Sequence, residues 1–167
     1  MKISRHFTPA PKSDNADFQS AFADVAFETH DASIVGAGGK TVFSMPDVVM
    51  PSAWSTVAKN IAVQKYFRKR GVPSKTATVK EKGVPDWLCA RKPVKNTEFG
   101  AETDIRQVVN RLAGTWTYWG WKAGVFDAES DARAYYGEMS YMLVTQMAAP
   151  NSPQWFNTGP NWAYGIE

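Results

Sequence analysis

Cysteine is nearly absent from this sequence of 167 residues, in which Cys89 is the one thiol. A single cysteine can form neither an internal disulfide nor a metal site with several cysteine ligands. A disulfide-rich secreted domain and a zinc finger are therefore excluded. None of the residues near Cys89 in the sequence completes a recognisable set of catalytic partners, and we interpret the thiol as structural. These features favour a protein of the reducing cytoplasm.

Long apolar runs and dense charge are also missing. The sequence contains no run of about 18 apolar residues, and its first eight residues lack the apolar centre of a signal peptide, so no membrane partner is expected. Charged residues make up 21% of the chain and the formal net charge is +3. Because no dense run of Lys or Arg marks a nucleic-acid surface, nucleic acid is not expected as a partner either.

Signatures of independent catalysis are lacking as well. His30 has no second histidine or carboxylate at metal-ligand spacing. The glycines at 36, 38 and 39 lack the six-residue fingerprint and the following helix of a dinucleotide-binding loop, and they predict only a turn. The sequence therefore assigns no catalytic and no metal-binding residue.

Aromatic residues are plentiful, with 7 Trp, 6 Tyr and 9 Phe. Several of them crowd around Gly120, namely Trp116, Tyr118, Trp119 and Trp121. A packed aromatic core is the favoured interpretation. A base-stacking platform is the alternative, but such platforms usually accompany a basic groove, which the sequence does not indicate.

The patterns predict one compact unit in four parts, mainly α with a small β-hairpin. Residues 1–25 are polar and aperiodic, which is typical of a flexible arm with a frayed terminus. In residues 26–50, apolar positions alternate on either side of a glycine-rich turn, which predicts the hairpin. Residues 51–149 predict a helical region, and residues 150–167 form a separate motif.

Three helices are expected between residues 51 and 149. The first begins at Ser52, the second is capped by Thr103 and the third by Asp127, and residues 71–101 connect the first to the second. Their predicted buried stripes comprise Trp54, Val57, Ala58, Ile61, Ala62 and Tyr66; Ile105, Val108, Val109, Leu112, Ala113 and Trp116; and Ala132, Tyr135, Tyr136, Met139, Leu143 and Met147. The basic residues that end the first helix, Lys65, Arg68, Lys69 and Arg70, complement its dipole, with phosphate binding as the minor alternative.

The motif at residues 150–167 holds prolines at 150, 153 and 160 and glycines at 159 and 165 among large aromatic residues. These residues rule out one continuous helix and predict a shaped loop with a short strand. Ser152 lies between Asn151 and Pro153, where a turn can hold its hydroxyl beside free backbone amides, an arrangement that suits a phosphate oxygen. The alternative to a binding loop is that these residues end the preceding helix and lead into a buried aromatic cluster.

The amino-acid sequence of this motif resembles the N-terminal region of cobalamin-dependent (class II) ribonucleotide reductase. The resemblance rests on Asn-Ser-Pro-Gln-Trp-Phe-Asn-Thr-Gly at 151–159, Trp-Ala-Tyr-Gly-Ile at 162–166 and Leu-Ala-Gly-Thr-Trp-Thr-Tyr-Trp-Gly-Trp-Lys at 112–122. It runs from about Ile34 to the last residue. It implies that residues 150–167 form the first segment of a ten-stranded α/β barrel that is not itself present, and that Ser152 contacts the ribonucleotide substrate.

In this family, adenosylcobalamin generates a thiyl radical on a barrel cysteine, and two further cysteines supply the reducing electrons. That chemistry requires at least three thiols, whereas this chain has one, which matches none of the family's catalytic positions. The resemblance therefore implies an incomplete reductase, with adenosylcobalamin bound only in the complete enzyme and with the remainder of the catalytic chain as a partner. A homo-oligomer and a non-catalytic interaction module with an aromatic surface remain open alternatives.

Overall fold

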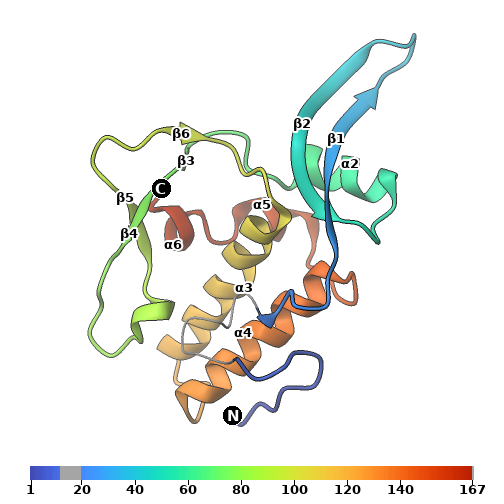
Figure 1. Ribbon diagram of the computed structural model, residues 1–167. Helices are drawn as coiled ribbons and strands as arrows, with labels where there is room; N and C mark the ends of the chain where they lie inside the picture. The colour runs from blue at the N-terminus through green and yellow to red at the C-terminus, as the bar shows by residue number, and fades with distance from the viewer. Residues whose placement is uncertain (12–19, 167) are drawn as a thin grey trace.

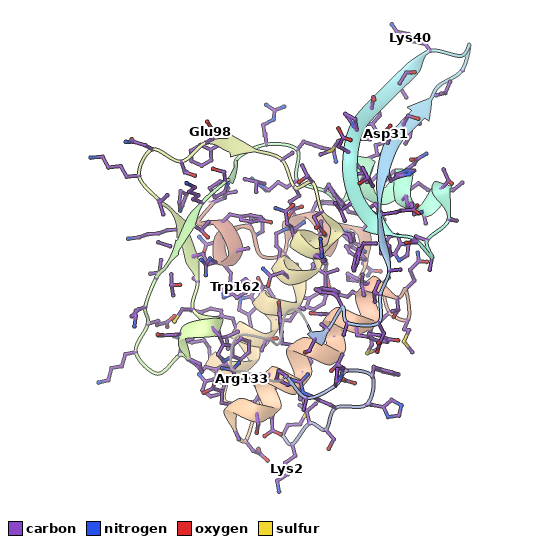
Figure 2. The ribbon with its side chains drawn as sticks, in the orientation of Figure 1. Lys2, Asp31, Lys40, Glu98, Arg133 and Trp162 are labelled. Carbon is purple, nitrogen blue, oxygen red and sulfur yellow. The ribbon has the colours of Figure 1, made fainter. Side chains whose placement is uncertain are left out.

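The computed structural model describes residues 1–11 and 20–166, and Figure 1 shows a β-hairpin projecting from a body built on two long helices. The hairpin pairs β1 (Phe27–Val35) with β2 (Thr41–Pro51) in antiparallel register. Register shifts after His30 and Ile34 bend the ribbon. Lys40 lies at the far end of the hairpin (Figure 2). The hairpin predicted from the alternating sequence is confirmed.

Helix α2 (Thr56–Lys65) begins later than predicted, because Ser55 rather than Ser52 caps it by accepting a hydrogen bond from the Ala58 amide. Its buried residues are Lys59, Ala62 and Val63. The predicted stripe is therefore wrong at Val57 and Ile61, which are exposed. On the buried face, the Lys59 ammonium reaches back to the hairpin, where it forms a 2.5 Å ion pair with Glu28.

The body is organised around α3 (Ile105–Lys122), which packs against α4 (Glu129–Val144). Asp104 rather than Thr103 caps α3, in a capping box with Gln107. Helix α4 follows Ala128, whose amide donates to Asp131, so the predicted cap Asp127 lies outside it. The predicted stripe of α3 is confirmed at Ile105, Val108, Val109, Leu112 and Ala113, and that of α4 at Ala132, Tyr136 and Leu143, whereas Met147 is exposed.

The connection predicted at residues 71–101 contains short antiparallel pairs of strands. β3 (Val72–Pro73) pairs with β6 (Phe99–Gly100), and β4 (Thr76–Thr78) pairs with β5 (Arg91–Pro93). A single turn of 3₁₀-helix, η1 (Asp86–Leu88), lies between the two middle strands. Strands of two or three residues offer too few positions for an alternating pattern, which explains why the sequence did not reveal them.

The predicted fold class, mainly α with a small β-hairpin leading into a barrel segment, is wrong. Of the described residues, 37% are helical and 20% lie in strands, so the fold mixes helices with small antiparallel pairs. The strand predicted in the motif is also wrong, because residues 152–157 and 160–164 form two short helices. No barrel occurs in the described part of the chain.

The first eight residues lie along α4, where the sequence favoured a frayed terminus. The carboxylate of Glu138 accepts hydrogen bonds of 2.8–2.9 Å from the amides of His6, Phe7 and Thr8, and the Phe7 ring stacks on Tyr141. Partial burial acts to raise the pKa of Glu138, but these bonds and one from the Thr8 hydroxyl outweigh it and lower the pKa. Within the predicted arm of residues 1–25, residues 12–19 lie outside the described residues, and Ala21 and Phe22 are buried in the protein core.

Two hydrophobic clusters form the interior. The larger joins α3, α4 and the base of the hairpin, and the smaller gathers around Trp162 at the centre of the body in Figure 2. Trp87 packs against both clusters. Among the helices that the structure describes, none is long and apolar enough to cross a membrane.

Candidate functional site

The motif folds into α5 (Ser152–Asn157) and α6 (Pro160–Tyr164), which both contact α3 (Figure 1). Pro153 and Pro160 lie in the first turns of these helices, where the missing amide hydrogen costs nothing. Gly159 separates the helices and Gly165 ends the second, each with a positive φ. The segment is therefore not one continuous helix, as predicted, but the prolines mark the starts of two short helices instead of a loop and a strand.

A fully buried arginine of α3, Arg111, fixes the motif in place. Its guanidinium donates to the carbonyl oxygens of Trp155 and Thr158, both at 2.8 Å, and to that of Tyr66 at 3.3 Å. Its two remaining N–H groups meet Glu102, at 2.8 and 3.1 Å. All five donors of the guanidinium are thus satisfied. Arg111 orients the backbone of α5 and of the turn that follows it.

Glu102 neutralises this arginine and is itself fully buried. Its oxygens also accept hydrogen bonds from the Tyr164 hydroxyl and the Arg68 amide, each at 2.8 Å. Burial, followed by the neighbouring Glu102 carboxylate, raises the pKa of the Tyr164 hydroxyl, which therefore stays protonated and donates. The buried polar network of Arg111, Glu102 and Tyr164 joins α3 to both ends of the motif.

Two glycines allow the motif to approach α3 closely. A Cβ atom on Gly159 would lie 2.5 Å from the Thr115 hydroxyl and still nearer to the Arg111 carbonyl. A Cβ atom on Gly114 would overlap the Trp162 ring. The indole N–H of Trp162 donates to the Leu88 carbonyl at 2.9 Å, which holds the ring against the helix. Both positions therefore exclude any side chain.

Ser152, the predicted substrate-binding residue, is exposed at the start of α5. Its Oγ lies 3.1 Å from the hydroxyl of Tyr66, a residue just beyond α2. The Tyr66 ring stacks on Trp155 at a centroid distance of 5.1 Å, so its hydroxyl is held in place. A mostly apolar cavity of about 260 Å³, lined in part by Tyr66, Pro150 and Trp155, lies beside this pair.

The remaining predictions from the sequence concern Cys89 and metals. Cys89 is buried, and its thiol points at the Val84 carbonyl at 3.7 Å, which agrees with a structural role. Among the described residues, no group of three or more His, Cys, Asp or Glu side chains could hold a metal ion.

Sequence reasoning missed Arg111, Glu102 and Tyr66. Arg111 follows Val108 by three residues and therefore lies within the apolar stripe of α3. A charged residue at a position predicted to be buried could have indicated a buried ion pair. Glu102 and Tyr66 carry no comparable signal, because their partners lie 9 and 86 residues away.

Comparison with known proteins identifies the family of this chain. Residues 28–146 match the family described as class II vitamin B12-dependent ribonucleotide reductase. The chain belongs to this family. It is 46% identical over 175 aligned positions to the vitamin B12-dependent ribonucleotide reductase of Agrobacterium fabrum, 45% over 175 to that of Bradyrhizobium diazoefficiens, and 30% over 151 to that of Rhodopirellula baltica.

These alignments cover all of this chain for the first two relatives and 90% for the third, but only 13%, 13% and 12% of the relatives themselves. The chain corresponds to the N-terminal part of these class II reductases, which are oxidoreductases. The resemblance seen in the sequence is thereby confirmed.

Proposed function

We propose that this chain supplies the N-terminal part of an adenosylcobalamin-dependent ribonucleotide reductase, which converts ribonucleotides to deoxyribonucleotides by thiyl-radical chemistry, and that it is inactive alone. One observation carries this proposal: a chain aligned along its whole length with such reductases holds a single thiol, which is buried. Radical formation and reduction of the ribose require at least three thiols. The reacting cysteines therefore belong to the remaining part of the reductase.

The cavity beside Ser152 does not fit the cobalamin cofactor. The cavity beside Ser152 measures about 260 Å³ and is mostly apolar, which is too small for a corrinoid ring with its nucleotide loop. His30, a conceivable ligand of a metal centre, instead shares a 2.8 Å hydrogen bond with Asn60. Cobalamin accordingly binds to the remaining part of the reductase, and this chain contributes no step of its radical chemistry.

A chimera tests the proposal. In it, this chain replaces the aligned N-terminal 13% of the Agrobacterium fabrum relative. We expect the chimera to reduce ribonucleotides in the presence of adenosylcobalamin and a dithiol, and the 167-residue chain to show no turnover under the same conditions. Turnover by the chain alone, or a folded chimera without activity, contradicts the proposal.

Ser152 is the residue that we propose to contact the ribonucleotide. Its hydroxyl is exposed, and the hydrogen bond to Tyr66 limits the directions in which it can point. A hydroxyl that is oriented before the substrate arrives loses less entropy on binding. The structure thus supports Ser152 as a polar contact and gives it Tyr66 as a positioning partner.

Replacing Ser152 with Ala in the chimera is expected to raise the KM for ribonucleotide by up to about tenfold, since one hydrogen bond of about 1 kcal/mol is lost. Tyr66→Phe keeps the stacked ring and removes only the orienting hydroxyl, so we expect a smaller rise. The double variant should match Ser152→Ala alone, because both changes act on one contact. Steady-state kinetics measures all three, and an unchanged KM in Ser152→Ala removes that residue from the substrate site.

A further inference from the structure

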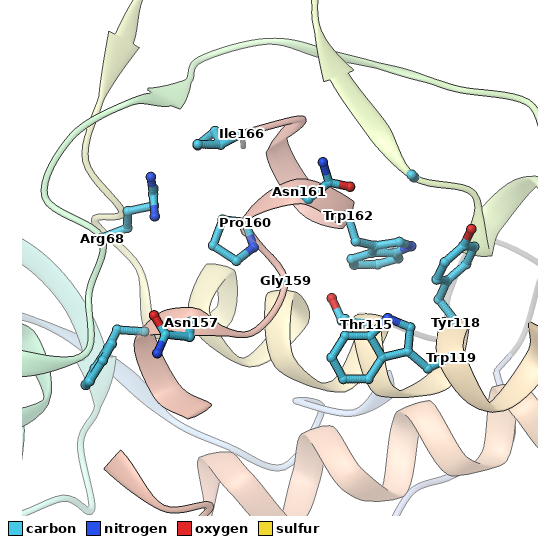
Figure 3. A pocket seen from close by; sticks show the side chains of 12 residues that line it. Arg68, Thr115, Tyr118, Trp119, Asn157, Gly159, Pro160, Asn161, Trp162 and Ile166 are labelled. Atoms are coloured by element: carbon cyan, nitrogen blue, oxygen red, sulfur yellow. The ribbon is translucent and has the colours of Figure 1, made fainter. Parts of the chain in front are cut away.

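A second and larger cavity lies beside the segment from Asn157 to Trp162, and Ser152 does not line it. It is an open groove of about 470 Å³, within the range of small-molecule sites. Figure 3 shows Arg68 and Asn157 at one end of the groove and Tyr118, Trp119 and Trp162 at the other, with Gly159 and Pro160 between them. The groove therefore has a cationic end and an aromatic end.

The cationic end is Arg68, whose backbone is fixed by hydrogen bonds to Glu102. Its amide donates to Glu102, and its carbonyl accepts from the Glu102 amide, both at 2.8 Å. Its Nε is buried without a hydrogen-bond partner, and no residue in the described part of the chain forms an ion pair with the guanidinium. A buried donor without a partner is costly, and an acceptor supplied by a ligand would remove that cost.

The charge of Arg68 is also uncompensated. Glu102 is the nearby carboxylate, but it is neutralised by Arg111, and its oxygens accept hydrogen bonds from that arginine, from Tyr164 and from the Arg68 amide rather than from the Arg68 guanidinium. This end of the groove therefore carries one excess positive charge. It favours an anion over a neutral or cationic group.

The aromatic end is electrically neutral and accessible. Trp119 is 56% exposed although it is a large apolar residue. Tyr118 donates to Glu81, which is in turn paired with Lys122, so no net charge from these groups faces the rings. An exposed indole beside a second indole, that of Trp162, provides a surface on which a planar ring can stack.

We propose that this groove binds an organic anion that carries a planar ring, with its phosphate or carboxylate on Arg68 and its ring against Trp119. The exposed amide side chain of Asn157 lies at the cationic end beside Arg68, where it can donate a further hydrogen bond to the anion. The proposed site is independent of the reductase activity and of Ser152, which does not line the groove.

Isothermal titration of the 167-residue chain tests the proposal with four probes. AMP supplies a phosphate with a ring, indole-3-acetate a carboxylate with a ring, adenosine a ring alone and inorganic phosphate an anion alone. We expect one of the two ring-bearing anions to bind more tightly than adenosine and phosphate, and the stronger of them identifies the preferred anionic group.

Arg68→Gln should weaken that binding by about tenfold or more, as expected for a charged hydrogen bond, and leave adenosine unaffected. Arg70→Gln removes an exposed charge two residues away and is the matched control. Trp119→Ala should weaken the ring-bearing probes and spare phosphate. Ser152→Ala should change nothing, which separates this site from the proposed substrate contact.

Equal affinities in Arg68→Gln and Arg70→Gln, or loss of binding in Ser152→Ala, would overturn the proposal. So would the absence of binding by both ring-bearing anions. Binding to the isolated chain that disappears in the reductase chimera would show that the rest of the enzyme covers the groove, and would overturn its role as a ligand site in that enzyme. Circular dichroism of each variant establishes that the fold is retained.

Discussion

Arg111→Met is expected to lower the free energy of unfolding by about 3–5 kcal/mol, because it leaves the carboxylate of Glu102 buried without its counter-ion. Both side chains have no exposed surface, so solvent cannot replace the lost partner. The carbonyl oxygens of Trp155 and Thr158 lose their donors as well. Urea denaturation followed by circular dichroism measures the change.

Two further variants isolate the cause. Arg106→Met removes an arginine of the same helix whose ion pair with Asp104 is partly exposed, and it should cost less than about 1 kcal/mol. Adding Glu102→Gln to Arg111→Met removes the unpaired charge and should restore part of the lost stability. A loss in Arg111→Met no greater than that in Arg106→Met would contradict the assignment of the buried network.

Gly159→Ala should destabilise the protein by at least about 2 kcal/mol, and it combines two costs. The φ of Gly159 is +87°, a conformation that costs an L-residue roughly 1–2 kcal/mol. The added methyl group also collides with the Arg111 carbonyl and the Thr115 hydroxyl, neither of which can move without disturbing α3. Thermal denaturation of the variant tests this expectation.

Gly38→Ala is the matched control for this substitution. Gly38 has a similar φ of +82°, but no atom lies within 4 Å of its added Cβ, so only the conformational cost applies. The difference between the two variants therefore measures the close approach of the motif to α3. Equal losses of stability would show that this approach contributes nothing.

The parts of the fold that repeat a pattern over many residues were predictable from the sequence. The hairpin alternates over two long strands, and α3 and α4 repeat apolar residues at helical spacing, so their presence was predicted even though each cap was misplaced by one residue. The short strands of residues 71–101 are set by pairing with distant partners. Pairing of this kind leaves no local trace in the sequence.

The candidate site was likewise predictable only in part. The sequence drew attention to the motif and to Ser152, and the family resemblance was confirmed, but the motif's helices were predicted as loop and strand. Proline was interpreted as a helix breaker at Pro153 and Pro160, whereas its position within a helix decides its effect. The role of Tyr66 depends on a contact across 86 residues, which only the fold brings together.

The position of the buried network along the chain has a consequence for folding. Glu102 and Arg111 precede the backbone groups of Trp155 and Thr158 by more than 40 residues. During synthesis from the N-terminus, Glu102 and Arg111 are therefore made before the segment whose backbone they bind. Bringing these distant segments together costs loop-closure entropy, which the buried hydrogen bonds of Arg111 must offset.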